Sequence, residues 1–205
     1  MRRRVLPLVL AAVLPSGALA QSADLLLNCS SCHALTPEAV PSLYPSLNGQ
    51  PARYLERQLD AYRMGLRRHP QMQQSAIALG EGAGAMARMY ADAPVPQLEQ
   101  RAELPPTAIA LVEEGDWSRG LPSCASCHGM AEAGEMRVAP RLHGQPAGYL
   151  ARQLRAYADG TRQSGQMGRM RAYSERLSSQ EITALADYYA AWRPARATQE
   201  DRPDG

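Results

Sequence analysis

The chain has 205 residues, which is enough for one domain or for two small ones. Its 22 basic and 20 acidic residues give a formal net charge of +2, and 45% of its residues are hydrophobic, an ordinary share for a protein that buries a core. This near balance of charge does not indicate nucleic-acid binding through bulk electrostatics.

The first 20 residues have the pattern of a secretory signal peptide. Three arginines at positions 2–4 are followed by an apolar run over residues 5–14 and by the small-residue cleavage site Ala-Leu-Ala at residues 18–20. A membrane anchor would need about 20 apolar residues, whereas prolines interrupt this run. We expect residues 1–20 to be removed on export to the periplasm, with no transmembrane segment in the mature protein.

All four cysteines of the chain belong to two copies of one motif, Cys-x-x-Cys-His. The copies are Cys29, Cys32 and His33, and Cys124, Cys127 and His128. This is the attachment signature of c-type haem, in which two thiols add to vinyl groups and the next residue binds iron through its imidazole. A disulfide within each pair would close a tiny loop, and a zinc site would require both copies to meet. We therefore predict two covalently bound haem c groups.

A longer repeat follows each motif. The segment "GQPARYLERQLDAYRMGLR" begins at Gly49 and "GQPAGYLARQLRAYADGTR" begins at Gly144, an offset of 95 residues that also separates Cys29 from Cys124. Motif and segment therefore belong to one duplicated unit of fewer than about 100 residues, a workable domain size if a buried cofactor adds stability. The sequence predicts two domains related by duplication.

Both repeated segments and the end of the chain carry helical patterns. In each repeat, large side chains recur three and four residues apart and form one amphipathic face. They are Tyr54, Leu55, Gln58, Leu59 and Tyr62, and Tyr149, Leu150, Gln153, Leu154 and Tyr157. A further helix is predicted from "LSSQEITALADYYAAW", with Ser178 as N-cap and Glu181 at the capping-box position. Since no strand-like alternation of any length occurs, the predicted fold class is all-α.

The corresponding last helix of the first unit reads "LGEGAGAMARMYAD" and lacks a serine cap. It contains Gly80, Gly82 and Gly84, and a glycine inside a helix costs about 0.5 to 1 kcal/mol relative to alanine. These glycines either weaken a helix or form a loop. In both cases we expect residues 79–86 to be looser than their counterparts in the second unit.

The segment "ADAPVPQLEQRAELPPT", residues 91–107, joins the two units. Its prolines and charges are typical of a linker. We therefore predict an N-terminal domain over residues 21–92, a linker over residues 93–107 and a C-terminal domain over residues 108–205.

Each haem iron needs a sixth ligand, and a methionine thioether is the usual choice in electron carriers because it raises the reduction potential. Met72 is the candidate for the first site. Counted back from the last helix with Tyr188 matched to Tyr90, Met170 has the spacing of Met72. Counted forward from the first helix, the offset of 95 residues matches Met167 to Met72 instead. We choose Met170 and keep Met167 as the alternative.

Two further pairs of residues recur with the haem motifs. Pro45 and Pro140 lie 12 residues after the motif histidines, and their carbonyls could accept the second N–H of each imidazole. The alternative is that these prolines only end a loop. Arg67 and Arg162 either pair with haem propionates or are solvated surface residues.

On these features the chain resembles the cytochrome c4 family, periplasmic dihaem carriers built from two class I cytochrome c domains. The resemblance rests on both haem motifs, the "P-x-L-x-G-Q" and "Y-L-x-x-Q-L" segments, the methionines and "LSSQEITALADYYAAW". It implies thioether bonds at all four cysteines and two domains with adjacent haem propionate edges. It also implies His33 and Met72 as ligands of one iron and His128 and Met170 as ligands of the other. Ala34 departs from the family, which usually has glycine there.

The function implied by the resemblance is single-electron transfer from a quinol-oxidising donor to a terminal oxidase or reductase. The alternative is a cytochrome subunit of a periplasmic dehydrogenase complex. A peroxidase would need one labile sixth site, whereas both units offer a methionine. We therefore expect an electron carrier, not an enzyme, with redox proteins as partners and no nucleic acid.

Overall fold

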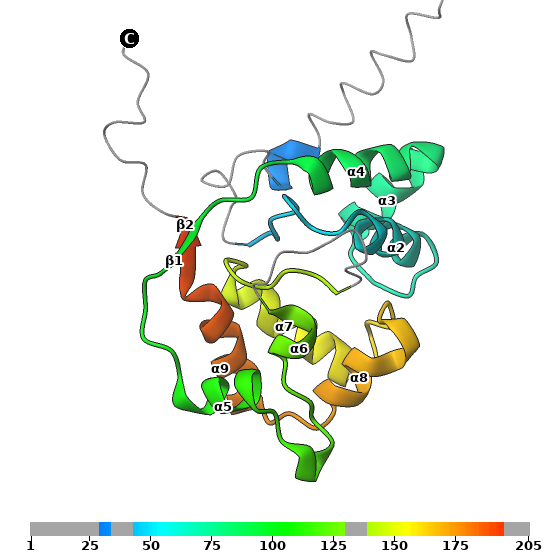
Figure 1. The fold of residues 1–205 in the computed structure, drawn as a ribbon. Coiled ribbons are helices and arrows are strands. Elements are labelled where there is room, and N and C mark those ends of the chain that lie inside the picture. The colour runs from blue at the N-terminus through cyan, green and yellow to red at the C-terminus, as the bar shows by residue number, and fades with distance from the viewer. Residues whose placement is uncertain (1–28, 34–42, 130–138, 195–205) are drawn as a thin grey trace, which may run out of the picture.

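The computed structural model describes residues 29–33, 43–129 and 139–194, and the helices of each half of the chain lie together (Figure 1). The predicted signal peptide, residues 1–20, lies outside the described residues. None of the helices in the described ranges has both the length and the apolar character needed to cross a bilayer.

The described part of the chain is mostly helical. Residues 29–33 are helical, and the first half continues with α2 (Ala52–Arg63), α3 (Pro70–Leu79), the 3-10 turn η2 (Gly80–Gly82) and α4 (Ala83–Asp92). The second half contains α5 (Pro106–Glu113), η3 (Trp117–Arg119), α6 (Ala125–His128), α7 (Ala147–Ala158), η4 (Gln166–Gly168), α8 (Arg169–Ser174) and α9 (Ser179–Ala190). The three-residue strands β1 (Leu98–Gln100) and β2 (Trp192–Pro194) form an antiparallel pair. The all-α prediction is confirmed.

Helices α2 and α7 are the two copies of the repeated segment, and both have 12 residues. Each begins after a proline with an extended backbone conformation, Pro51 or Pro146. The proline ring fixes φ at a value that is compatible with the start of a helix. Two residues after the end of each helix lies a left-handed glycine, Gly65 with φ 71° or Gly160 with φ 75°. The same local signals therefore begin and end both helices.

The second half has the larger core. Helix α9 packs against α5 and α7, and buries Ile182 and Leu185 with Leu111 and Leu150. The predicted cap of α9 is confirmed, because Ser178 and Glu181 form both hydrogen bonds of a capping box. In the first half, α2 contacts α3 and α4, and the buried residues of its smaller cluster are Leu55, Ala87 and Tyr90.

The last helical segment of the first half is broken where α9 is continuous. Helix α3 ends at Leu79, and Gly80 then adopts a φ of 48°, which favours glycine. The turn η2 follows, and α4 starts at Ala83 without a side-chain cap. Gly80 and Gly82 therefore form a turn, the second of the two possibilities considered above, whereas Gly84 lies inside α4. The looser character of residues 79–86 stays a prediction.

The predicted linker contacts both halves. Strand β1 pairs with β2, and α5 begins at Pro106, inside the range predicted as linker. Val95 lies so close to Gly49 that a Cβ at Gly49 would overlap it, and Leu98 lies 3.3 Å from the Cβ position of Gly144. These glycines open the two repeats and have φ of 64° and 82°. Because glycine has no side chain, there is room for the linker at both equivalent positions.

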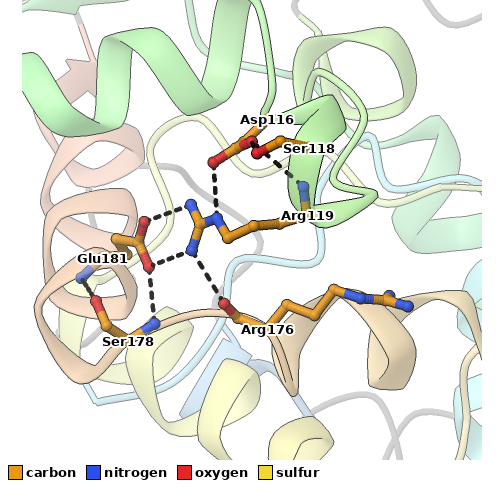
Figure 2. Close-up of polar contacts among 6 residues, drawn as sticks. All are labelled: Asp116, Ser118, Arg119, Arg176, Ser178 and Glu181. Carbon is orange, nitrogen blue, oxygen red and sulfur yellow. Dashed lines mark hydrogen bonds and ion pairs between the residues drawn. The ribbon is translucent and has the colours of Figure 1, made fainter.

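Arg119 connects the turn before the second cysteine motif to the start of α9 (Figure 2). Its guanidinium donates to Asp116 (2.7 Å), to both carboxylate oxygens of Glu181 (2.7 and 3.2 Å) and to the carbonyl of Arg176 (3.1 Å). Glu181 also accepts from the N–H of Ser178 at 2.8 Å. Because Arg119 stabilises the charged form, the pKa of Glu181 falls to about 2. The contact is therefore a pH-dependent source of stability.

Replacing Glu181 by glutamine should lower the free energy of unfolding of the haem-loaded protein at pH 7. The folded pKa of about 2 lies below the unfolded value of about 4.3, so the wild-type advantage is complete above pH 5 and is lost as the pH falls towards 2. Denaturant titrations of wild type and Glu181→Gln at several pH values measure this difference.

Glu175→Gln is the matched control, because the Arg171–Glu175 pair lies on the surface with side chains 54% and 45% exposed. Exposed pairs contribute about 0 to 1 kcal/mol, so this variant should follow the wild type. A difference between wild type and Glu181→Gln that is the same at pH 7 and pH 3 would contradict the assigned role of Arg119.

Candidate haem sites

The second half places one copy of the cysteine motif beside a cavity. Cys124 precedes the short helix α6, which carries Cys127 and His128. Gly115, with φ 79°, permits the close turn before the motif, because a Cβ there would lie 2.5 Å from the carbonyl oxygen of Leu121. The local backbone therefore holds the motif against the core of the second half.

The cavity has a volume of about 240 Å³. Its lining includes the side chains of Cys124, Cys127 and His128, together with Met170 from α8. The apolar part of the wall comes from Leu121, Leu142, Leu150, Leu154, Leu177 and Leu185. The cavity is therefore a low-dielectric space with two thiols, one imidazole and one thioether at its wall.

Both motif histidines are oriented by a backbone carbonyl. The Nδ1 of His33 lies 2.9 Å from the carbonyl oxygen of Pro45, and the Nδ1 of His128 lies 2.8 Å from that of Pro140. A carbonyl can only accept, so Nδ1 carries the proton in each ring and the lone pair is on Nε2. This is the tautomer that binds a metal through Nε2.

The first half places its motif on the helical residues 29–33. Cys29 packs against the cluster of Leu55 and Tyr90, and His33 is buried. Burial lowers the pKa of His33, and the nearby positive charge of Arg67 lowers it further, against the raising effect of the Pro45 hydrogen bond. A neutral imidazole, which is the form that binds metals, is therefore favoured.

The candidate methionines differ in position. Met170 is half-buried and lines the cavity, whereas the side chain of Met167 is 78% exposed and its backbone has φ 52°. Met72 is half-buried on α3, where its N–H donates to Nδ1 of His69 at 3.4 Å. Met86 and Met89 pack against the core cluster of the first half.

One step in the sequence argument for Met170, the matching of Tyr188 to Tyr90, was wrong. The N–H of Gly49 donates to the carbonyl of Tyr90, and the N–H of Gly144 donates to that of Tyr189, both at 2.9 Å. Since Gly49 and Gly144 are equivalent, the counterpart of Tyr90 is Tyr189 and not Tyr188. The last helices are therefore offset by one residue more than the sequence comparison assumed, and the support for Met170 comes from its place at the cavity.

The first cysteine thiol of each motif is favoured in its neutral form. Burial, with a smaller contribution from Cys127, raises the pKa of Cys124 to about 11. Burial and Cys32 also raise the pKa of Cys29. Zinc binds thiolates, and the described residues contain no group of three or more Cys, His, Asp or Glu side chains that could hold a metal. The donor set therefore fits covalent haem better than a zinc site.

The sequence missed a set of buried polar residues between the two halves. Gln50 exchanges two hydrogen bonds of 2.9 Å with the backbone of Arg141, and Gln145 exchanges bonds of 2.8 and 3.0 Å with the backbone of Ser46. The two contacts are equivalent, because Gln145 lies 95 residues after Gln50 and Arg141 lies 95 residues after Ser46. In the sequence these glutamines belong to the repeated "GQ" dipeptide, and in the structure they contact the opposite half.

The two repeated arginines also lie between the halves. Arg67 and Arg162 are 7% and 5% exposed, so neither is a solvated surface residue. Arg67 donates to the hydroxyl of Tyr149, and Arg162 donates to that of Tyr54. Of the two possibilities considered from the sequence, the surface one is wrong.

Comparison with known proteins identifies relatives over most of the chain. The family model described as "Cytochrome C oxidase, cbb3-type, subunit III" matches residues 117–188. A thiosulfate dehydrogenase electron acceptor from Stutzerimonas stutzeri (strain A1501) is 35% identical over 79% of this chain and 77% of the relative. A cytochrome c4 from Thiocapsa roseopersicina is 31% identical over 78% of this chain and 84% of the relative.

Solved structures agree with these sequence relatives. The fold matches reduced recombinant cytochrome c4 from Pseudomonas stutzeri with a TM-score of 0.70 and 26% identity, covering 85% of this chain and 97% of that one. It also matches the thiosulfate dehydrogenase TsdBA from Marichromatium purpuratum with a TM-score of 0.68 and 33% identity. That match covers 86% of this chain but only 41% of the longer enzyme. The chain therefore belongs to the cytochrome c4 family, electron carriers with covalently bound haem c and two class I cytochrome c domains, and is not an enzyme.

Proposed function

We propose that the chain carries two haem c groups and transfers single electrons in the periplasm. The observation that carries this proposal is the cavity of the second half, which gathers Cys124, Cys127, His128 and Met170 at one apolar space. The same motif recurs in the first half, where Cys29, Cys32, His33 and Met72 would be the equivalent residues. We propose the domains as residues 21–92 and 108–205, joined by residues 93–107.

The residues of each site have separable tasks. The two thiols of each motif form the covalent attachment, and when bound the haem supplies an iron that alternates between the ferrous and ferric states. The Pro45 and Pro140 carbonyls hold the imidazoles in one orientation and keep the proton on Nδ1. Met170 supplies a soft thioether, and the leucines of the cavity wall exclude water. Because each iron would be held by a histidine and a methionine, no ligand position would be left for bond-making chemistry.

The partners that we propose are redox proteins. The family resemblance favours a quinol-oxidising donor and a terminal oxidase or reductase as acceptor. A second donor is favoured by relatives that are named electron acceptors of thiosulfate dehydrogenase and are 35% and 32% identical to this chain. In that case the chain would accept electrons from thiosulfate oxidation.

The first prediction is two haems per mature chain of residues 21–205. A pyridine haemochrome assay with protein quantification should give a ratio of two, and intact mass should agree. The double variant Cys124→Ala/Cys127→Ala should retain one haem, because its first motif is intact. A ratio of one in the wild type would contradict the proposed pair of sites.

Met170→Ala should remove the thioether-to-iron absorption of one site, so the ferric band near the red edge of the visible spectrum falls by about half. Met167→Ala should leave the band unchanged, because Met167 is exposed and does not line the cavity. Spectra of the two oxidised variants at equal haem content make the comparison. Loss of the band in Met167→Ala with retention in Met170→Ala would reverse the ligand assignment.

The donor can be tested with purified components. Oxidised holoprotein mixed with a thiosulfate dehydrogenase and thiosulfate should become reduced, as followed by its haem absorption, and omission of the dehydrogenase is the control. If ascorbate reduces the same sample but the complete mixture is no faster than the control, thiosulfate dehydrogenase is not the donor. The electron-carrier role would then depend on a quinol-oxidising complex.

A further inference from the structure

The carbonyl that orients His33 belongs to a peptide unit that the opposite half also contacts. The carbonyl oxygen of Pro45 accepts from Nδ1 of His33 at 2.9 Å. The N–H of the same peptide unit, which belongs to Ser46, donates to Oε1 of Gln145 at 3.0 Å. A peptide unit is planar and rigid, so its two ends move together. The position of the Pro45 carbonyl therefore depends on a contact with each half of the chain.

The second half contains the same arrangement in reverse. The carbonyl oxygen of Pro140 accepts from Nδ1 of His128 at 2.8 Å. In the same peptide unit, the N–H of Arg141 donates at 2.9 Å to Oε1 of Gln50, which belongs to the first half. Each motif histidine is therefore connected, through one peptide unit, to a glutamine of the opposite half.

Each glutamine makes a second hydrogen bond to the residue that it contacts. Nε2 of Gln145 donates to the carbonyl of Ser46 at 2.8 Å. Nε2 of Gln50 donates to the carbonyl of Arg141 at 2.9 Å. Gln145 and Gln50 are 5% and 4% exposed, so water has little access to these bonds. One side-chain amide thus satisfies both backbone groups of one residue and fixes that residue in place.

The two peptide units are not held by regular secondary structure. Residues 45–46 and 140–141 lie outside the helices and strands of the described chain. Proline has no N–H, so the N–H of the residue after it is the nearest backbone donor that can fix its carbonyl. In both halves that donor is bonded to the glutamine of the opposite half. The glutamines are therefore well placed to set the positions of both carbonyls.

The backbone of each glutamine is held by its own half. The N–H of Gln145 donates to the carbonyl of Leu142 at 3.0 Å, and the N–H of Gln50 donates to that of Leu47 at 3.1 Å. The next residue in each copy is the proline that precedes α7 or α2. Each side chain therefore projects from a fixed turn, and its amide links the position of one half to the peptide unit of the other.

We propose that Gln145 and Gln50 are positioning residues for the haem-binding histidine of the opposite half, Gln145 for His33 and Gln50 for His128. This inference rests on the proposed pair of haem sites. A hydrogen bond donated by a peptide N–H polarises the carbonyl of the same peptide, which then accepts more strongly from the imidazole. A stronger acceptor makes the imidazole more basic and favours the more highly charged ferric state. The contact between the halves therefore adjusts each site from the other half.

The test is a crossed pair of variants in the holoprotein, Gln145→Leu and Gln50→Leu, which keep a side chain of similar size but lose the hydrogen bonds. In Gln145→Leu, the Nδ1–H of His33 should exchange with solvent roughly tenfold faster, the size expected for the loss of one or two hydrogen bonds. His128 should keep its wild-type exchange, because Gln50 still bonds Arg141. Gln50→Leu should give the reverse pattern. NMR of the reduced protein with isotope-labelled histidine measures both signals.

A spectroelectrochemical titration of the same variants gives an independent measurement. The ferric/ferrous equilibrium should move towards ferrous at the first site in Gln145→Leu and at the second site in Gln50→Leu. Gln153→Leu is the matched control, because Gln153 accepts from Arg67 across the boundary at 3.1 Å but contacts neither peptide unit. Its histidine signals should exchange as in the wild type, even if its Tm is lower. If a leucine variant fails to fold, the corresponding asparagine variant, whose amide is too short to make both bonds, should change the same single site.

Three outcomes would overturn the proposal. Equal changes at both histidines, or the same changes in Gln153→Leu, would show a general loosening of the boundary. A change at the histidine of the same half alone would reverse the assignment. Unchanged exchange and potentials with a lower Tm would show that the glutamines only dock the halves. Failure of the underlying function is distinguished beforehand, because it would appear in the wild type as a haem ratio other than two or as a missing thioether band.

Discussion

The arrangement of the two halves depends on the satisfaction of buried polar groups where two copies of one unit meet. A buried amide or guanidinium without partners costs about 1 to 3 kcal/mol or more, so each must find hydrogen bonds within the boundary. Duplication supplies a solution, because several donors on one copy face acceptors on the other, and the same contacts recur in the reverse direction. Gln50 and Gln145 bond the opposite backbone, and Gln58 and Gln153 each accept from both Arg67 and Arg162.

These contacts connect the chemistry of the two candidate sites. The carbonyls of Pro45 and Pro140 hold the histidines, while the residues next to them, Ser46 and Arg141, bond the glutamines of the opposite half. The orientation of each imidazole is therefore linked through the backbone to the docking of the other half. The linker adds to this arrangement, because Val95 packs against Gly49 and β1 pairs with β2.

Equivalent positions of the two halves nevertheless differ in their local contacts. In the second half, Arg119 and the capping box fasten the start of α9 to the turn before the cysteine motif. In the first half, the glycine-rich turn η2 separates α3 from α4, and α4 begins without a side-chain cap. The second half thus has the larger core and a capped last helix, whereas the last helix of the first half follows a glycine-rich turn and has no side-chain cap.

The sequence by itself determined the helical class, the haem motifs and the cap at Ser178, because each depends on residues within one or two turns of each other, and it showed the repeat because both copies keep the same residues in the same order. Only the tertiary structure decided which residues meet across the boundary, that Arg67 and Arg162 are buried, that Tyr189 is the counterpart of Tyr90, and that Met170 and not Met167 lines the cavity. Those outcomes depend on packing between segments about 100 residues apart, and a one-residue difference between two helices leaves no local signal in either.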